Sequence, residues 1–418
     1  RRVSSASPTT PSRSPSFEEG EEVGTTRPMQ RLLNGDVGSG KTIVAAVAAA
    51  AVARAGFQTA YLAPTEVLAI QQAKAFTRWL QPLGVRTALW TRTEQCMDGV
   101  EVSARELAAA VREGTAGVIV GTHAILSSRA KFHALAFACI DEQHRFGVAQ
   151  RAALRAKAEG VLPHLLSMTA TPIPRTLTLT LLGDLAISVL DELPRNRTPV
   201  HTIVALIADR PAMTRAIREE LAAGHQAFIV CAQIDADDAG EVAATTEALE
   251  RARRAFPHAC VAMLHGRLRT SEQRAVMEQF RIGAVHVLVA TTVIEVGVDY
   301  PNATVMVIEN AERFGLAQLH QLRGRVGRGA DGGICFLTTR SEDPSVRMRL
   351  ERVATCTDGF ALAELDLAER GPVMALGTLQ SGWPTFRIAT LDPVFLKRVQ
   401  AVAAALPSSG STTSVHLE

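Results

Sequence analysis

The sequence predicts an α/β protein of two tandem, doubly wound domains, each built on a parallel sheet. Three observations lead to this prediction: the length, the alternation of apolar runs with amphipathic stretches, and a proline-containing break near the middle. With 418 residues, 47% of them hydrophobic and 21% charged, the chain is long enough for two domains that each bury a core. Because this architecture serves many functions, the function has to be argued from motifs.

The expected elements follow one another in regular order. Short, near-continuous apolar runs are typical of strands that are covered on both faces of a parallel sheet, and helical stretches separate them. Expected strands of the first domain are 31–35, 59–64, 117–122, 137–142 and 164–171, and those of the second are 226–232, 260–266, 286–292, 305–310 and 333–339. Between the two series, "DELPRNRTPV" (191–200) has two prolines and mixed charge, and it is the expected linker.

The two ends of the chain differ from the middle. Residues 1–26 are rich in Ser, Thr and Pro without apolar periodicity, so a disordered segment or a linker is expected there. The first 17 residues contain Arg and Ser but no acid, which is a composition typical of transit peptides. A bacterial cytoplasmic location and, alternatively, a plastid or mitochondrion therefore both stay open. The tail from Leu406 is polar as well.

The composition limits the classes of protein to which this chain can belong. No apolar run reaches the roughly 20 residues that span a bilayer, so a membrane protein is not expected. The six cysteines include no CxxC pair and the eleven histidines have no metal-ligand spacing, so no structural metal is expected. Three cysteines stand in apolar runs, which indicates buried free thiols in a reducing compartment. A net charge of +2 neither requires nor forbids a nucleic-acid partner, because a local basic track is enough.

The first chemical motif is "GDVGSGKT", which fits GxxxxGK[ST] at each required position. It follows an apolar strand and precedes a strong helix-forming stretch. Glycines let successive backbone N–H groups point at phosphates, Lys41 supplies a charge to the β/γ-phosphates, and Thr42 supplies a hydroxyl ligand for Mg²⁺. The motif predicts a nucleotide site whose candidate residues are Gly35, Asp36, Val37, Gly38, Ser39, Gly40, Lys41 and Thr42.

Two acids follow a later strand in "FACIDEQH". This position places Asp141 and Glu142 at the carboxyl edge of the sheet, where ligands bind in open α/β folds. Asp141 can hold the hydrated Mg²⁺, and Glu142 can polarise the attacking water. An acid pair alone is a weak signal, but after an apolar strand and downstream of a phosphate loop it indicates nucleotide hydrolysis.

The second domain ends with "HQLRGRVGRG" (320–329), in which glycines separate three arginines. Glycine is a poor helix former, so an ordinary solvated helix face does not explain the pattern. We predict that Arg323, Arg325 and Arg328 are a set of arginine fingers that reach the γ-phosphate held by the first domain, with Arg325 and Arg328 as candidate catalytic residues. A basic RNA-binding patch is the alternative interpretation.

Together these motifs resemble the helicase part of the RecG family, bacterial branched-DNA helicases of superfamily two. The resemblance runs in order from about Arg27 to about Leu391. Further motifs that carry it are "APTEVLAIQQ" (63–72), "VGTHAIL" (120–126), "MTATPIPRTL" (168–177), "LHGRLR" (264–269) and "ATTVIEVGVDYPNA" (290–303). The transcription-repair coupling factor is similar too, but "DEQH" (141–144) in place of "DEEH" and the 191–200 segment favour RecG.

The resemblance implies roles for further residues. Gln143 and His144 would sense the γ-phosphate and pass its state to Thr169 and Thr171, while Gly297 and Asp299 would face the nucleotide. Small and polar residues at strand ends suit a nucleic-acid backbone, which needs N–H and hydroxyl donors more than charge. These implied contacts are Pro64, Thr65, Glu66, Gly121, Thr122, His123, Thr291 and Thr292. For any one of them an ordinary loop hydroxyl or helix cap is the alternative.

Residues 358–382 resemble the family's translocation motif, a helical hairpin and loop that couple lobe closure to movement along duplex DNA. Arg370 and Gln380 match it as coupling residues, whereas Val373, Met374 and Leu379 depart from the family's Gly, Glu and Arg. The implied organisation is a linker (1–26), RecA-like lobe 1 (27–192), RecA-like lobe 2 (193–345), the helical hairpin (346–392) and a loose tail (393–418).

The implied function is a monomeric, ATP- and Mg²⁺-dependent DNA helicase or translocase that acts on branched DNA in recombination and repair. The family's wedge domain and its adenine-reading segment have no counterpart in residues 1–26, so weak fork specificity and reduced discrimination between ATP and other triphosphates are expected. The alternatives are a duplex DNA translocase of the coupling-factor type, an RNA helicase, and a non-catalytic fragment that binds nucleotide or DNA.

Overall fold

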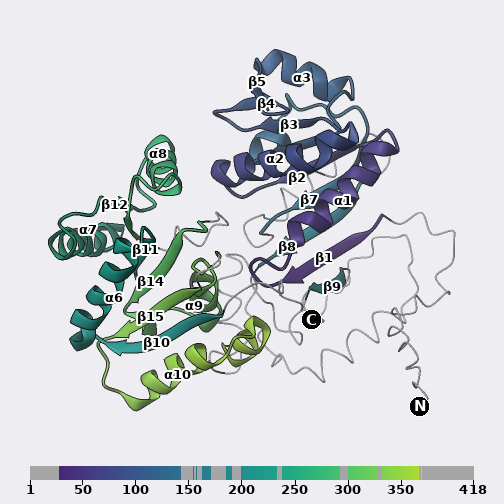
Figure 1. Cartoon of the computed structure of the whole chain (residues 1–418). Helices are drawn as coiled ribbons and strands as arrows, with labels where there is room; N and C mark the ends of the chain where they lie inside the picture. Colours follow the sequence, from purple (N-terminus) through teal and green to yellow (C-terminus); the bar gives the residue numbers. More distant parts are fainter. Residues whose placement is uncertain are drawn as a thin grey trace, which may run out of the picture.

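The computed structural model describes residues 28–142, 154, 157, 162–170, 185–190, 199–232, 238–291, 300–327, 329, 332–366 and 369. Within these residues the chain forms two α/β lobes, one around a nine-stranded sheet and one around a six-stranded sheet (Figure 1). Apolar clusters lie on both faces of each sheet. The predicted fold class of two tandem doubly wound domains is confirmed.

The sheet of lobe 1 has the strand order β5-β4-β3-β6-β2-β7-β8-β1-β9. Its parallel strands are β1 (Gln30–Gly35), β2 (Gln58–Leu62), β3 (Thr87–Trp90), β6 (Val118–Gly121), β7 (Leu135–Ile140), β8 (His164–Thr169) and β9 (Ala186–Leu190). The short strands β4 (Gln95–Met97) and β5 (Val100–Glu101) add an antiparallel edge. Helices α1 (Lys41–Arg54) and α2 (Glu66–Leu80) pack on one face and α3 (Ala104–Arg112) on the other, with 3₁₀ turns η1 (Gln81–Leu83) and η2 (His123–Leu126).

The sheet of lobe 2 is parallel throughout, in the order β10-β15-β14-β11-β13-β12. Its strands are β10 (Val200–Leu206), β11 (Gln226–Cys231), β12 (Val261–Leu264), β13 (Val287–Ala290), β14 (Ala303–Glu309) and β15 (Gly333–Thr339). Helices α6 (Arg210–Ala222) and α7 (Asp238–Ala255) cover one face; α8 (Thr270–Arg281), α9 (Leu316–Arg323) and α10 (Pro344–Thr355) cover the other. The 3₁₀ turns are η4 (Ile207–Asp209) and η6 (Ala311–Arg313).

All ten strands expected from the sequence are present, with ends that differ by at most two residues. Five observed strands were not expected: β3, β4, β5, β9 and β10. Strands β4 and β5 have only three and two residues, which leaves no apolar pattern to detect. The predicted linker lies mostly outside the described residues, and β10 begins at its last residue, Val200.

Each lobe anchors an interior strand with one buried glutamine. Gln58 is the first residue of β2 and Gln226 is the first residue of β11. Both side-chain amides donate to carbonyls around the C-terminus of a neighbouring helix, where a helix leaves its last carbonyls without partners. The bonds run from Gln58 Nε2 to Val111 O and Ala116 O, and from Gln226 Nε2 to Phe280 O and Val285 O, at 2.6–2.9 Å. The two lobes therefore share this buried glutamine contact as well as the α/β topology.

Cys139, Cys231 and Cys335 are buried free thiols, as their apolar surroundings in the sequence predict. None of the helices in the described part of the chain has the length and apolarity that crossing a bilayer requires.

Candidate functional site

The phosphate loop (35–42) connects β1 to α1 at the carboxyl edge of the lobe 1 sheet, which is the context that the motif requires. Gly38 and Gly40 have φ values of 82° and 92°, in a region that side chains disfavour. A Cβ added to Gly35 would lie 3.0 Å from Cβ of Leu190, so the chain has no room for a side chain there. Because α1 begins at Lys41, its first N–H groups and its dipole favour an anion at the loop.

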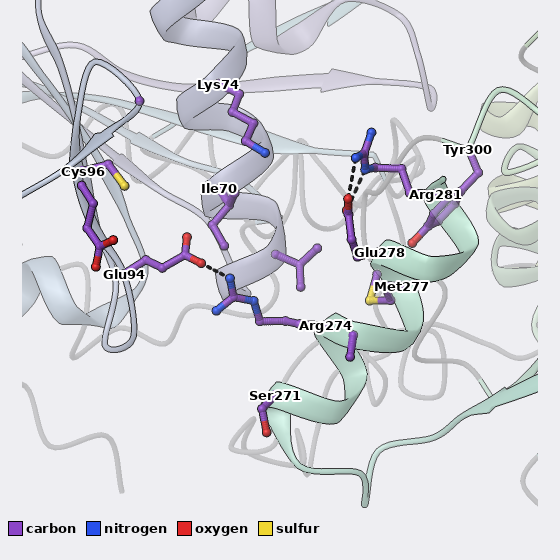
Figure 2. Close-up of a pocket in the computed structure, with 14 residues that line it drawn as sticks. Ile70, Lys74, Glu94, Cys96, Ser271, Arg274, Met277, Glu278, Arg281 and Tyr300 are labelled. Atoms are coloured by element: carbon purple, nitrogen blue, oxygen red, sulfur yellow. Dashed lines mark hydrogen bonds and ion pairs between the residues drawn. The ribbon is translucent and has the colours of Figure 1, made fainter. Parts of the chain in front are cut away.

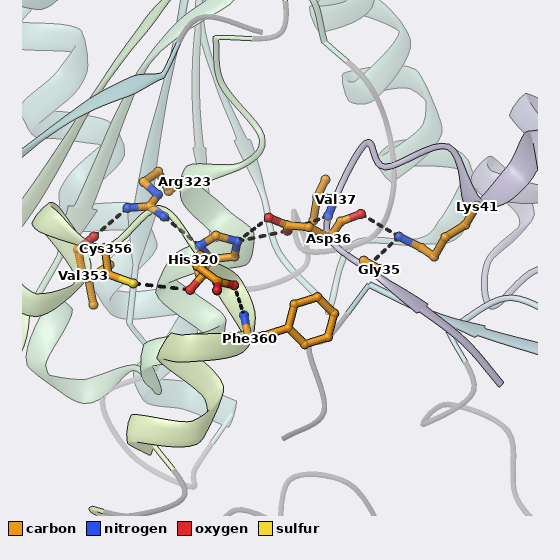
Figure 3. Close-up of polar contacts among 10 residues, drawn as sticks. Gly35, Asp36, Val37, Lys41, His320, Arg323, Val353, Cys356 and Phe360 are labelled. Carbon is orange, nitrogen blue, oxygen red and sulfur yellow. Dashed lines mark hydrogen bonds and ion pairs between the residues drawn. The ribbon is translucent and has the colours of Figure 1, made fainter. Parts of the chain in front are cut away.

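Lys41 is held by its own loop. Its Nζ donates to the carbonyl oxygens of Gly35 and Asp36, both at 2.8 Å (Figure 3). Burial lowers the pKa of Lys41, while the carboxylates of Glu142, Asp141 and Asp36 oppose that shift. A phosphate oxygen bound in the loop would compete with the two carbonyls for this ammonium group.

The two predicted Mg²⁺ ligands meet through a tyrosine. The Tyr61 hydroxyl donates to Asp141 Oδ2 at 2.9 Å, and the Thr42 side chain lies close enough to lower the pKa of this hydroxyl. Burial, together with the neighbouring Glu142, raises the pKa of Asp141 to about 6. Carboxylate and hydroxyl oxygens suit Mg²⁺, and a cation would neutralise these crowded acids, so the residues present fit this ion. Sequence reasoning missed Tyr61; the available signal was a tyrosine in an apolar strand that ends at the same sheet edge.

Glu142 lies against the end of β8. Its backbone has φ of 53°, an uncommon conformation for a residue other than glycine. Its N–H donates to Asp141 Oδ1 at 3.1 Å, and its Oε2 accepts from the Ala170 N–H at 3.4 Å. The second acid is therefore in contact with the segment that begins at Thr169, the predicted coupling residue.

Lobe 2 approaches the phosphate loop with the turn after α9. Arg325 is 3% exposed, and its charge is one of the groups that lower the pKa of Lys41. A Cβ added to Gly324 would lie 3.5 Å from Cβ of Val37, so the turn and the loop are in van der Waals range. The structure thus brings together Lys41, Asp141, Glu142 and Arg325, and we call this group the interlobe site.

Arg323 is not an arginine finger in this structure, which corrects the prediction that all three arginines reach the nucleotide. It is the last residue of α9, on the side that faces α10, and it is 6% exposed. Its guanidinium donates to Val353 O at 2.5 Å and to His320 Nδ1 at 2.7 Å (Figure 3). The role of Arg323 is therefore to hold α9 against α10.

Most of the predicted nucleic-acid residues of lobe 1 line one groove of about 1100 Å³. Pro64, Thr65, Glu66, Thr122 and His123 are among its lining residues. Three arginines that sequence reasoning missed line it too: Arg92, Arg105 and Arg129. The groove therefore combines polar donors at strand and helix ends with positive charge, as a phosphate backbone requires.

Three predicted nucleic-acid residues have structural duties. Thr65 is the N-cap of α2 and accepts from the Leu68 N–H, which is the helix-cap alternative. Gly121 has no space for a side chain, since an added Cβ would lie 2.2 Å from Trp90 O. Thr291 is 2% exposed and its N–H donates to Leu264 O, so it does not join the groove.

The Glu66 carboxylate accepts two hydrogen bonds from within lobe 1. One of its donors, Thr93, also contacts lobe 2. The carboxylate accepts from the Arg92 N–H at 3.2 Å and from the Thr93 hydroxyl at 2.8 Å. Arg274 of α8 donates to the same Thr93 oxygen at 3.1 Å and pairs with Glu94. Figure 2 shows the Arg274–Glu94 pair, which lies across a cleft of about 800 Å³ between α2, the β4–β5 hairpin and α8. No sequence motif indicated the bridge.

The remaining predicted site residues lie outside the described part of the chain. They are Gln143, His144, Thr171, Thr292, Gly297, Asp299, Arg328, Arg370 and Gln380.

Comparison with protein families finds two matches. The model of the DEAD/DEAH box helicases matches residues 22–180, and that of the helicase conserved C-terminal domain matches residues 212–330. Each match therefore falls on one of the two lobes.

Curated relatives match most of the chain. "ATP-dependent DNA helicase RecG" of Synechocystis sp. is 48% identical over 372 residues, which cover 89% of this chain and 44% of the relative. The protein of the same description from Escherichia coli strain K12 is 46% identical over 382 residues, 90% of this chain and 54% of the relative. The chain thus spans about half the length of the relatives that it matches.

Among solved structures, RecG bound to a three-way DNA junction superposes with a TM-score of 0.73 at 38% identity, covering 90% of this chain and 48% of that one. The helicase MrfA bound to DNA has a TM-score of 0.58 at 17% identity over 78% of this chain and 48% of that one, which shows a shared fold.

Proposed function

Because this chain belongs to the RecG-like helicases of superfamily two, we propose that it is an ATP-dependent DNA helicase or translocase that acts on branched DNA in recombination and repair. The observation that supports this most is the interlobe site. Asp141 and Glu142 lie beside Lys41 in lobe 1, and the charge of Arg325 in lobe 2 acts on Lys41, so a nucleotide bound at Lys41 would be close to both lobes.

In the proposed chemistry, the N–H groups of the phosphate loop and the Lys41 ammonium bind the β- and γ-phosphates of ATP. Thr42 and Asp141 would hold Mg²⁺, which would supply charge neutralisation at the phosphates. Glu142 orients the attacking water and accepts its proton. Arg325, joined by Arg328, stabilises the charge that develops on the γ-phosphate.

Movement would follow from the position of these groups on two lobes. While the γ-phosphate is present, donors from both lobes bind it and favour closure. Its release removes the charge that Arg325 binds, so the lobes can separate and close again on the next ATP. Gln143 and His144, and then Thr169 and Thr171, would report the γ-phosphate, with Gly297 and Asp299 at the nucleotide and Arg370 and Gln380 coupling closure to movement.

The lobe 1 groove is the proposed DNA track. Its arginines would neutralise phosphates of either strand, and polar groups at Thr65, Thr122 and His123 would contact the backbone. Thr292 would extend the track onto lobe 2. We further propose lobe boundaries of 27–192 and 193–345 and a coupling hairpin at 346–392, in a monomer of the bacterial cytoplasm.

The decisive experiment measures phosphate release with single-stranded, duplex and forked DNA and with RNA. We expect stimulation by duplex and forked DNA, and a loss of about a hundredfold or more in Lys41→Ala and Glu142→Gln. Glu219→Gln, an exposed change on α6, is the matched control and should keep full activity. Nucleotide binding without DNA-stimulated hydrolysis would identify a non-catalytic fragment, and stronger stimulation by RNA would identify an RNA helicase.

A further inference from the structure

A buried chain of hydrogen bonds joins the phosphate loop to lobe 2 (Figure 3). Its central residue is His320 of α9, which is 5% exposed. His320 Nε2 lies 2.9 Å from both carboxylate oxygens of Asp36, and His320 Nδ1 lies 2.7 Å from a guanidinium nitrogen of Arg323. The hydrogen-bonded path ends at the carbonyl oxygen of Val353 in α10, which accepts from Arg323. The described residues thus contain a continuous polar path from Asp36 to α10.

The partners of His320 determine where its proton lies. A guanidinium has donors and no acceptor, so His320 Nδ1 must accept the hydrogen bond from Arg323 and carries no proton. The proton of the neutral ring is therefore on Nε2, which donates to the Asp36 carboxylate. This position requires one donor at one end and one acceptor at the other. Glutamine offers both groups, alanine offers neither, and lysine offers only donors.

Asp36 links His320 to the rest of the phosphate loop. Its Oδ1 also accepts from the Val37 N–H at 2.6 Å, and its backbone oxygen accepts from Lys41 Nζ at 2.8 Å. His320 therefore fixes the residue whose carbonyl contacts Lys41. Arg325 follows on the turn after the same helix, so His320 sets the distance between the phosphate-binding groups of the two lobes.

We propose that His320 is a positioning residue for ATP hydrolysis, which donates to Asp36, accepts from Arg323 and so holds the phosphate loop in register with Arg325. This inference rests on the proposed function and adds a residue to its mechanism. Lobe 1 alone carries the loop that binds ATP, so the register matters when both lobes engage the γ-phosphate in the transition state. Loss of His320 should therefore lower kcat more than it raises KM.

The test compares three substitutions in the full chain, with kcat and KM of DNA-stimulated hydrolysis as readouts. We expect His320→Gln to stay within about threefold of wild-type kcat, because it keeps one donor and one acceptor. His320→Ala should lower kcat about tenfold with KM within about twofold. His320→Lys should be at least as impaired as His320→Ala, because its ammonium faces Arg323 and cannot accept. The exposed His258→Ala is the matched control and should match wild type.

A double-mutant cycle identifies the partner. In an Asp36→Ala background, adding His320→Ala should lower kcat by less than a further factor of about two, because the path from His320 to the phosphate loop is already broken. A full tenfold cost in that background, or a His320→Gln variant as slow as His320→Ala at an equal Tm, overturns the proposal. If His320→Ala does not fold, Asp36→Ala must itself reproduce the fall in kcat, and an unchanged kcat there overturns the proposal as well.

The two claims fail in different ways. A wild-type chain without DNA-stimulated hydrolysis overturns the proposed function and this inference with it. An active wild type whose His320→Ala variant has the wild-type kcat overturns the inference alone.

Discussion

Tyr61 shows how much a single side chain contributes to the interlobe site. It is fully buried in β2, and burial together with Asp141 raises the pKa of its hydroxyl well above its usual range. The hydroxyl therefore stays protonated and donates to Asp141 Oδ2. This one group therefore orients Asp141, a candidate Mg²⁺ ligand, in the way that outer partners orient metal ligands elsewhere, and it lies beside Thr42.

We therefore predict that Tyr61→Phe raises the Mg²⁺ concentration needed for half-maximal ATP hydrolysis by about tenfold, because Asp141 loses the hydrogen bond that orients it. Phenylalanine keeps the ring and its packing against Phe76. The measurement is the hydrolysis rate as a function of Mg²⁺ concentration. Tyr300→Phe is the matched control, since the buried Tyr300 hydroxyl has no hydrogen-bond partner among the described residues. An equal Mg²⁺ requirement in both variants would rule out the role of Tyr61.

At the scale of elements, the strands that the sequence predicts are mostly buried along their length, although the equally buried β3 was missed. Strands such as β7 and β13 consist of apolar residues throughout, so their pattern survives without tertiary context. The edge hairpin β4–β5 has no such pattern, because β4 buries only Met97 and both residues of β5 are exposed. The interior strands also need polar anchors. Gln58 uses its whole amide, since its Oε1 accepts from the N–H groups of His133 and Ala134.

Gln58→Leu should destabilise the fold by about 2–5 kcal/mol, because it leaves buried carbonyls and N–H groups without partners. Denaturant unfolding followed by circular dichroism measures this loss. Gln279→Leu, an exposed change on α8, should alter stability by less than about 0.5 kcal/mol. If both variants unfold at the same denaturant concentration, the buried amide does not anchor β2.

At the scale of the whole molecule, polar contacts between described residues join the lobes at two separate places. One is the His320–Asp36 contact beside the phosphate loop. The other is the Arg274–Glu94 pair, which spans the cleft in Figure 2. Both partners of that pair are about a third exposed, so the pair contributes little to stability. The groove with Arg92, Arg105 and Arg129 also reaches lobe 2, at Gln273.

The triple variant Arg92→Ala, Arg105→Ala, Arg129→Ala should weaken DNA binding equally for different sequences, because phosphate contacts carry no sequence information. The slope of log K against log salt concentration should become shallower by about one for each phosphate that the variant no longer neutralises. Binding isotherms at several salt concentrations measure both effects. Arg253→Ala, an exposed change on α7, is the control. An unchanged slope would place the DNA track elsewhere.

The sequence by itself determined the two α/β lobes, the phosphate loop, the acid pair and the glycine-separated arginines. These features depend on contiguous residues, whose apolar pattern and glycine spacing act over a few positions. Tertiary structure decided which of them meet. Tyr61 and Asp141 are 80 residues apart in the chain, and Asp36 and His320 are 284 apart. Such contacts arise only when packing sets strand order and lobe position, which is why Arg323 turned out to bond α10 while Arg325 lies close enough to affect Lys41.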